Sequence, residues 1–196
     1  FQINTLILKH PDSICFDLKK ANYHEELEYL ISSSARNKFI CNLALDMKEN
    51  TLLLFRFVEK HGRLLYNMIK EKADATNRKT FFVYGGTDAD TREQIRHIVE
   101  RERDSIIVAS YGVFSVGVNI RNLHNIIFAS PYKSRIRNLQ SIGRGLRTHE
   151  NKDGAKIYDI ADDFKNNNHT IKHFVKRIGI YNQEEFDYEI IKVNLK

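Results

Sequence analysis

Short apolar runs that alternate with longer amphipathic segments constrain the fold of this 196-residue chain more than any other feature. The runs are rich in Leu, Ile, Val and Phe, and they occupy residues 51–55, 80–84, 105–109, 125–129 and 155–160. Runs of this length are typical of strands that are buried on both faces. Apolar residues at helical spacing fill the intervals, as at Leu64, Leu65, Met68 and Ile69. The alternation predicts an α/β fold, with a parallel sheet flanked by helices on both faces.

Three segments are expected along the chain. Residues 49–163 contain the alternating core, residues 1–48 form an N-terminal flank, and residues 164–196 form a C-terminal helix and tail that pack on the core. Each flank also contains one expected strand, near 3–8 and within 186–195. The chain does not start with methionine, so we expect a piece of a longer polypeptide. The N-terminal flank would then also link the core to a preceding domain.

Polar residues predict where two of the helices begin. Thr91 is expected to cap a helix whose buried stripe contains Ile95, Ile98 and Val99. Asp162 and Asp163 follow the last apolar run and are expected to cap the C-terminal helix. In that helix we expect an apolar face and a polar face, formed by Ile171, Phe174, Val175 and Ile178 and by His169, Lys172, His173, Lys176 and Arg177 respectively.

Composition and charge exclude some classes of protein. No apolar run approaches the ~20 residues of a membrane helix, and no basic segment followed by an apolar one marks a secretory signal. Cys15 and Cys41 lack the spacing of a metal site, which favours a reducing, cytoplasmic compartment. The net charge of +6 favours a polyanionic partner such as DNA or RNA.

The stretch from Gln140 to Arg147 carries the strongest functional signal. On a helix, Gln140, Arg144 and Arg147 fall at positions i, i+4 and i+7 and share one face. Two guanidinium groups on one face bind polyphosphate through charge-assisted hydrogen bonds. Spacing alone leaves two interpretations open, an arginine-rich surface helix with salt bridges and a phosphate-binding helix.

This stretch resembles motif VI of the superfamily-two helicases, Q-x-x-G-R-x-x-R, with all four specified residue types in register. Residues 106–119 resemble motif V, and residues 52–57 resemble motif IV. Tyr84-Gly85-Gly86 followed by Arg92 resembles the strand, turn and helix between them. The resemblance covers residues 51–160 and implies a RecA-like second motor domain. Residues 34–38 and the histidine-rich tail are similar to the phage recombination helicases of the UvsW type.

The resemblance implies roles for five residues at a nucleotide. Arg144 and Arg147 would be arginine fingers that reach the γ-phosphate of ATP held by a first motor domain. Gln140 would position the nucleotide or the attacking water. Gly117 and Asn119 would approach the ribose and the phosphates. Many relatives have Asp where this chain has Asn119, and an amide hydrogen-bonds a hydroxyl without bringing a charge.

The resemblance also implies a track for nucleic acid. The phosphates of a strand would be contacted by Ser110, Tyr111, the backbone at Gly85 and Gly86, and the side chain of Arg56. Such contacts position a strand without reading its sequence. His169 and His173, one helical turn apart, have no third metal ligand nearby in sequence. A solvated or DNA-facing polar stripe is therefore favoured over a zinc site for them.

The chain contains no G-x-x-x-x-G-K-[ST] phosphate loop and no Asp-Glu pair that ends a buried strand. We therefore expect ATP and Mg²⁺ to be held mainly by the first motor domain, and this fragment alone to be inactive. The expected function is an ATP-dependent DNA helicase or translocase that remodels branched DNA or R-loops, in the host cytoplasm if phage-encoded. The alternatives are a translocase subunit of a restriction enzyme and a non-enzymatic nucleic-acid-binding module.

Overall fold

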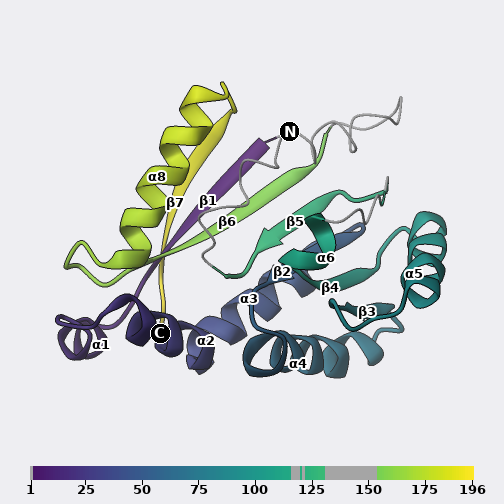
Figure 1. Cartoon of the computed structure of the whole chain (residues 1–196), viewed down its shortest axis with the longest axis horizontal. Coiled ribbons are helices and arrows are strands. Elements are labelled where there is room, and N and C mark those ends of the chain that lie inside the picture. Colours follow the sequence, from purple (N-terminus) through teal and green to yellow (C-terminus); the bar gives the residue numbers. More distant parts are fainter. Residues whose placement is uncertain (1, 116–119, 121, 131–153) are drawn as a thin grey trace.

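The strands form one sheet in which every neighbouring pair runs parallel. The computed structural model describes residues 2–115, 120, 122–130 and 154–196. Within them the strands are β1 (Gln2–Lys9), β2 (Thr51–Phe55), β3 (Thr80–Val83), β4 (Ile106–Ser110), β5 (Asn125–Phe128), β6 (Lys156–Asp163) and β7 (Tyr188–Asn194). Their order across the sheet is β3-β4-β2-β5-β6-β1-β7 (Figure 1). Because all the pairings are parallel, the expected parallel sheet is confirmed.

The two flanks contribute strands to this sheet. β1 lies between β6 and β7, with Ile3 opposite both Ile157 and Tyr188. β6 runs to Asp163, three residues beyond the apolar run that ends at residue 160. The sheet therefore crosses both of the boundaries drawn between core and flanks. The division into residues 1–48, 49–163 and 164–196 stays a prediction.

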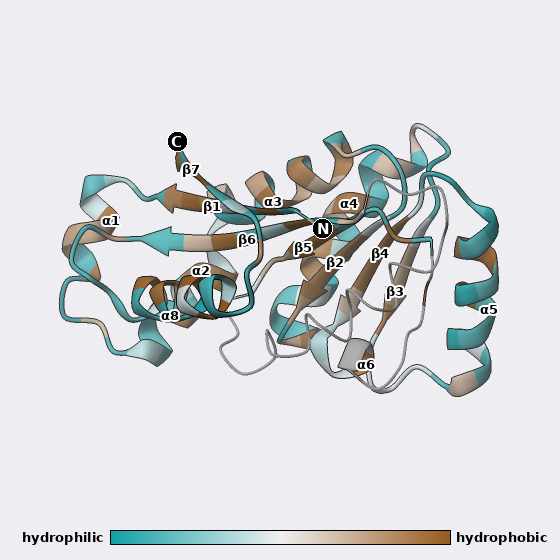
Figure 2. Ribbon diagram, turned by 90° about the horizontal axis from the view of Figure 1, so that it is seen from above, coloured by the Kyte–Doolittle hydropathy of each residue, from teal (hydrophilic) through white to brown (hydrophobic). Residues whose placement is uncertain are grey.

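Helices cover both faces of the sheet (Figure 1). The described helices are α1 (Asp12–Asp17), α2 (Tyr23–Ser32), α3 (Ser34–Asp46), the π-helical turn η1 (Val58–Gly62), α4 (Arg63–Asp74), α5 (Ala89–Arg101), α6 (Tyr111–Ser115) and α8 (His169–Gln183). On β2, Leu53 packs with the residues of α3 and α4, whereas Leu52 and Leu54 pack on the opposite face with those of α5, α6 and α8. Both faces of β2 are thus apolar, and the central strands carry the strongest apolar colouring in Figure 2.

Side-chain caps set the starts of α2 and α5. Asn22 caps α2 in a reciprocal box, in which its Oδ1 accepts from the Glu25 amide at 2.9 Å and its own amide donates to Glu25 Oε2 at 2.7 Å. Asp88, rather than Thr91, caps α5. Asp88 Oδ1 accepts from the Thr91 amide at 2.8 Å. Thr91 lies in the first turn of the helix and is thus the residue that the cap binds.

The expected cap at Asp162 and Asp163 is wrong, because both residues lie inside β6. α8 begins at His169, and a residue of α2 binds its first amides. The buried Glu26 accepts from the amide of His169 at 2.8 Å and from that of Thr170 at 3.0 Å. A carboxylate at a helix amino terminus is favourable, and here it also joins α2 to α8.

Three apolar residues and one arginine depart from the predicted faces. Leu64 and Ile98 are exposed, and Val175 is 63% exposed. Arg177, which we expected at a polar position of its helix, is buried. Its Nε donates to Asp159 Oδ2 on β6 at 2.9 Å. Because a buried guanidinium needs a partner, this ion pair turns α8 so that Arg177 faces the sheet and Val175 faces solvent.

Candidate nucleic-acid interface

The described candidate residues gather at the carboxyl edge of the sheet. Arg56 follows β2, Gly85 and Gly86 follow β3, Ser110 ends β4, and Tyr111 begins α6. The strands β3, β4 and β2 are adjacent and parallel, so their carboxyl ends meet at one edge. The other predicted residues, Gln140, Arg144, Arg147, Gly117 and Asn119, lie outside the described residues.

Ser130, which follows β5, connects the ends of three strands. Its buried hydroxyl oxygen accepts from the Arg56 amide at 3.3 Å. Its carbonyl oxygen accepts from the Tyr111 hydroxyl at 2.9 Å. Ser130 therefore fixes the position of the Arg56 backbone relative to the Tyr111 side chain. No local sequence pattern singles out Ser130, because its partners lie 74 and 19 positions away.

The buried imidazole of His61, on η1, forms a hydrogen bond with the Ser130 hydroxyl. Burial, together with the nearby charge of Arg36, lowers the pKa of His61 to about 3. The ring is therefore neutral and has one donor and one acceptor. Its Nε2 donates to Asn37 Oδ1 at 3.0 Å, because the Asn37 amide nitrogen is already bound to the carbonyl of Ile31. Its Nδ1 then accepts from the Ser130 hydroxyl at 3.3 Å.

The side chain of Arg56 is exposed at this edge. Its guanidinium lies 4.9 Å from the centre of the Phe57 ring. Its Nη1 donates to the Tyr23 hydroxyl at 3.3 Å. Tyr23 begins α2 in the N-terminal flank, and nothing in the sequence pattern connects it with Arg56, 33 positions away. An oriented, solvent-accessible guanidinium binds phosphate oxygens well.

The turn after β3 exposes backbone close to the same edge. Thr87 closes it, since its amide donates to the Tyr84 carbonyl at 3.0 Å and its hydroxyl accepts from the Tyr84 amide at 3.1 Å. A Cβ at Gly86 would lie 2.4 Å from Cε2 of Tyr84, whereas a Cβ at Gly85 would meet nothing within 4 Å. Close packing thus accounts for Gly86, and the open space beside Gly85 leaves its backbone accessible.

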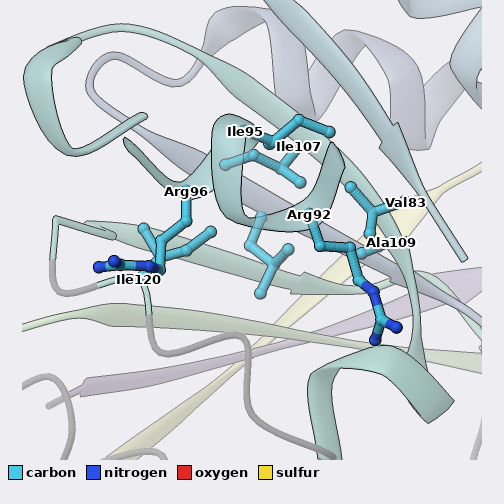
Figure 3. Close-up of a pocket in the computed structure, with 8 residues that line it drawn as sticks. Val83, Arg92, Ile95, Arg96, Ile107, Ala109 and Ile120 are labelled. Atoms are coloured by element: carbon cyan, nitrogen blue, oxygen red, sulfur yellow. The ribbon is translucent and has the colours of Figure 1, made fainter. Parts of the chain in front are cut away.

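Arg92, in the first turns of α5, borders a small apolar cavity between α5 and the sheet (Figure 3). The stems of Arg92 and Arg96 line it together with Val83, Ile95 and Ile107. The two guanidinium groups point away from each other in Figure 3. Arg96 pairs with Glu93 and Glu100, whereas the buried Nε of Arg92 has no hydrogen-bond partner in the described structure. The cavity itself is a packing gap and offers no polar group to a ligand.

Behind the edge, a buried ion pair fixes α3 to β6. Arg36 Nε and Nη2 donate to the two carboxylate oxygens of Asp162 at 2.9 and 3.0 Å. His10 Nε2 binds Asp162 Oδ1 at 2.8 Å, and His10 Nδ1 lies 3.1 Å from the Tyr29 hydroxyl. Burial opposes ionisation of Asp162, but the charge of Arg36 and the bonds from His10 and Arg36 outweigh it, so its pKa is lowered.

The described residues form neither a metal site nor a membrane-spanning helix. Among the described residues, no group of three or more His, Cys, Asp or Glu side chains is arranged to hold a metal ion. His169 and His173 instead lie near the Tyr23 ring, with centroid distances of 6.4 and 5.1 Å. No described helix is long and apolar enough to cross a membrane.

Comparisons with known proteins agree on one family. A family model described as the helicase conserved C-terminal domain matches residues 35–149. The ATP-dependent DNA helicase uvsW of Enterobacteria phage T4 is 36% identical over 210 residues, which cover 99% of this chain and 41% of that protein. This chain therefore spans about two fifths of the length of that relative.

Solved structures give the same answer for the fold. The crystal structure of T4 UvsW matches 100% of this chain and 42% of that chain, with a TM-score of 0.86 and 36% identity. Domain 2 of the DEAD-box helicase Mss116p, bound to an RNA duplex, matches 97% of this chain and 64% of that one, with a TM-score of 0.57 and 10% identity. The second likeness shows the fold alone. Together they confirm the RecA-like helicase C-terminal fold.

Proposed function

Because this chain belongs to the family of helicase conserved C-terminal domains, we propose that it is the second motor domain of an ATP-dependent DNA helicase or translocase. Its substrates are branched DNA or R-loops in recombination and replication repair. The name of the phage relative, a DNA helicase, supports DNA as the partner. If the protein is phage-encoded, it acts in the host cytoplasm.

The observation that carries the proposal is the meeting of three motif-like segments at one edge. Arg56, the Gly85–Gly86 turn and Tyr111 come from separate parts of the chain and are oriented together by Ser130 and by adjacent parallel strands. Their accessible groups are a guanidinium and backbone amides, which suit the phosphates of a nucleic-acid strand. Contacts of this type hold a strand without reading its bases.

ATP and Mg²⁺ would be held mainly by a preceding motor domain of the same polypeptide. Arg144 and Arg147 act as arginine fingers that stabilise charge on the transferring phosphoryl group. Gln140 positions the nucleotide or the attacking water, and Gly117 and Asn119 approach its ribose and phosphates. Closure of two domains on ATP and their release after hydrolysis would then move the protein along DNA.

ATP turnover by the full-length protein, with and without branched DNA, tests this proposal. We expect DNA-stimulated turnover that falls ~10³-fold or more in Arg144→Ala, with nucleotide binding retained. Arg101→Ala removes an exposed arginine at the far end of α5 and serves as the matched control. Normal turnover in Arg144→Ala would show that the arginine-finger assignment is wrong.

Two alternatives make different predictions. Absence of turnover in the wild type would favour a non-enzymatic nucleic-acid-binding module. A translocase subunit of a restriction enzyme requires a nuclease domain elsewhere in the full chain. The structure of the restriction enzyme LlaBIII bound to DNA is 15% identical in sequence to this chain, with a TM-score of 0.59. This likeness shows the fold alone and does not favour that alternative.

A further inference from the structure

A polar surface continues from Arg56 onto the two flanks. The Tyr23 hydroxyl accepts from Arg56 Nη1 at 3.3 Å, and the Tyr23 ring lies 5.1 Å from the ring of His173 and 6.4 Å from that of His169. Arg56 and His169 are exposed, and Tyr23 and His173 are half-buried. The core, α2 and α8 therefore meet at one solvent-accessible point beside the proposed nucleic-acid edge.

The exposed face of α8 is positively charged beyond this point. Lys172 and Lys176 are exposed and fall three and seven positions after His169, on the same side of the helix. From His169 to Gln183 the helix has no acidic residue. Neither lysine takes part in an ion pair within the described residues, whereas Lys60, Lys70, Lys79 and Lys165 each pair with a carboxylate.

Within the part of the chain that the structure describes, no acidic residue of α2 forms an ion pair with a lysine of this face, and each has another partner. Glu25 accepts from the Asn22 amide in the capping box. Glu28 pairs with Lys60 at 3.0 Å. Glu26 is buried and binds the first amides of α8, so it also fixes α8 relative to Tyr23. The lysines are thus presented on a helix whose position is set by α2.

We propose that the α8 surface, formed by Tyr23, His169, Lys172, His173 and Lys176, binds the phosphate backbone of the nucleic-acid strand that passes Arg56. The inference rests on the proposed function, and it extends the nucleic-acid track from the strand ends to both flanks. Lys172 and Lys176 contribute positive charge to phosphates, and Tyr23 connects this surface with Arg56. Contacts through phosphates make this binding independent of base sequence.

Salt-dependent binding of a fluorescein-labelled oligothymidylate to the full-length protein tests the inference. The variant Lys172→Ala/Lys176→Ala removes two phosphate contacts, each of which contributes ~0.7 to the slope of log affinity against log salt for a single strand. We expect the slope to decrease by ~1.4 and the affinity at 0.1 M salt to fall ~25-fold. Lys70→Ala/Lys72→Ala makes the same change of net charge on α4, against the opposite face of the sheet, and should leave both values unchanged.

The outcomes distinguish a failure of this inference alone from a failure of the proposed function. If the α8 variant keeps the wild-type slope while Arg56→Ala weakens binding, the α8 surface does not bind the strand, and the proposed function stands. If both lysine pairs reduce the slope equally, the effect is one of net charge and the inference is wrong. Wild-type protein that binds no oligonucleotide at any salt concentration overturns both. Crosslinking of a 4-thiothymidine strand to the α8 peptide would support the inference independently of affinity.

Discussion

Replacement of Arg36 by methionine tests whether the buried ion pair holds α3 on the sheet. Arg36 is fully buried, and two of its nitrogens bind Asp162 at 2.9 and 3.0 Å. Methionine fills much of the same volume with apolar atoms and cannot donate a hydrogen bond. In Arg36→Met, the buried carboxylate of Asp162 keeps, of its side-chain bonds within the described residues, the one from His10 at 2.8 Å.

We expect the free energy of unfolding at pH 7 to fall by ~3–5 kcal/mol, the usual cost of removing one partner of a buried pair. This is a large part of the ~5–15 kcal/mol that stabilises a domain. The folded pKa of Asp162 is lowered, so its stabilising contribution is complete above the unfolded pKa of ~3.9 and is lost as the pH falls through the folded pKa. The difference between wild type and variant should therefore narrow below about pH 4.

Urea unfolding of the chain, followed by circular dichroism at several pH values, measures this difference. Lys38→Met on the exposed side of α3 is the matched control and should cost little. The double variant Arg36→Met/Asp162→Leu should recover most of the loss, because Nη1 of Arg36 is buried without a hydrogen-bond partner and its desolvation is not fully offset. A loss below about 1 kcal/mol in Arg36→Met would refute the reasoning.

Two further predictions concern η1 and α8. His61 has a pKa of about 3 in the folded chain, against ~6.5 in the unfolded chain. Between these two pH values only the unfolded chain binds a proton at this imidazole. The free energy of unfolding should therefore fall by up to ~1.4 kcal/mol per pH unit as the pH decreases. The variant His61→Gln should lack this slope in urea unfolding between pH 6.5 and 4.5; an unchanged slope would assign it to other groups. A Cβ at Gly62 would lie 2.4 Å from Cε2 of the buried Phe55, whereas one at Gly179 would meet nothing within 4 Å. Gly62→Ala should therefore lower the free energy of unfolding by ~1–3 kcal/mol. Gly179→Ala should raise the free energy of unfolding by up to ~1 kcal/mol. Equal effects of the two substitutions would contradict the packing argument.

The core strands were predictable because their signal is local. Thr51–Phe55 and Ile106–Ser110 are buried along their whole length, and only a strand covered on both faces needs such a continuous apolar run. The strand ends that carry Arg56, Gly85 and Tyr111 followed from the same pattern. Residue types at helicase motif positions then predict phosphate binding at these ends, because guanidinium groups and backbone amides suit phosphates.

Two errors arose where a distant partner decided the position of a polar side chain. Asp162 follows an apolar run and so resembles a helix cap, but Arg36, 126 positions away, draws it into the sheet. Arg177 and Val175 exchanged faces because Asp159 lies beneath α8. A one-dimensional pattern records the preference of each residue for water and does not record a partner that offsets the cost of burial.

The sequence by itself determined the parallel α/β architecture, the strands and most helices, since these depend on periodicity and on residues close along the chain. Only the tertiary structure decided that β1 and β7 complete the sheet, that Ser130 connects Arg56 with Tyr111, and that Tyr23 joins both to α8. Among the contacts between β1 and β7, the Thr5 hydroxyl donates to the Glu189 carbonyl, 184 positions away. The formation of such contacts depends on the burial and hydrogen bonding that the whole fold provides, and therefore no local pattern could reveal them.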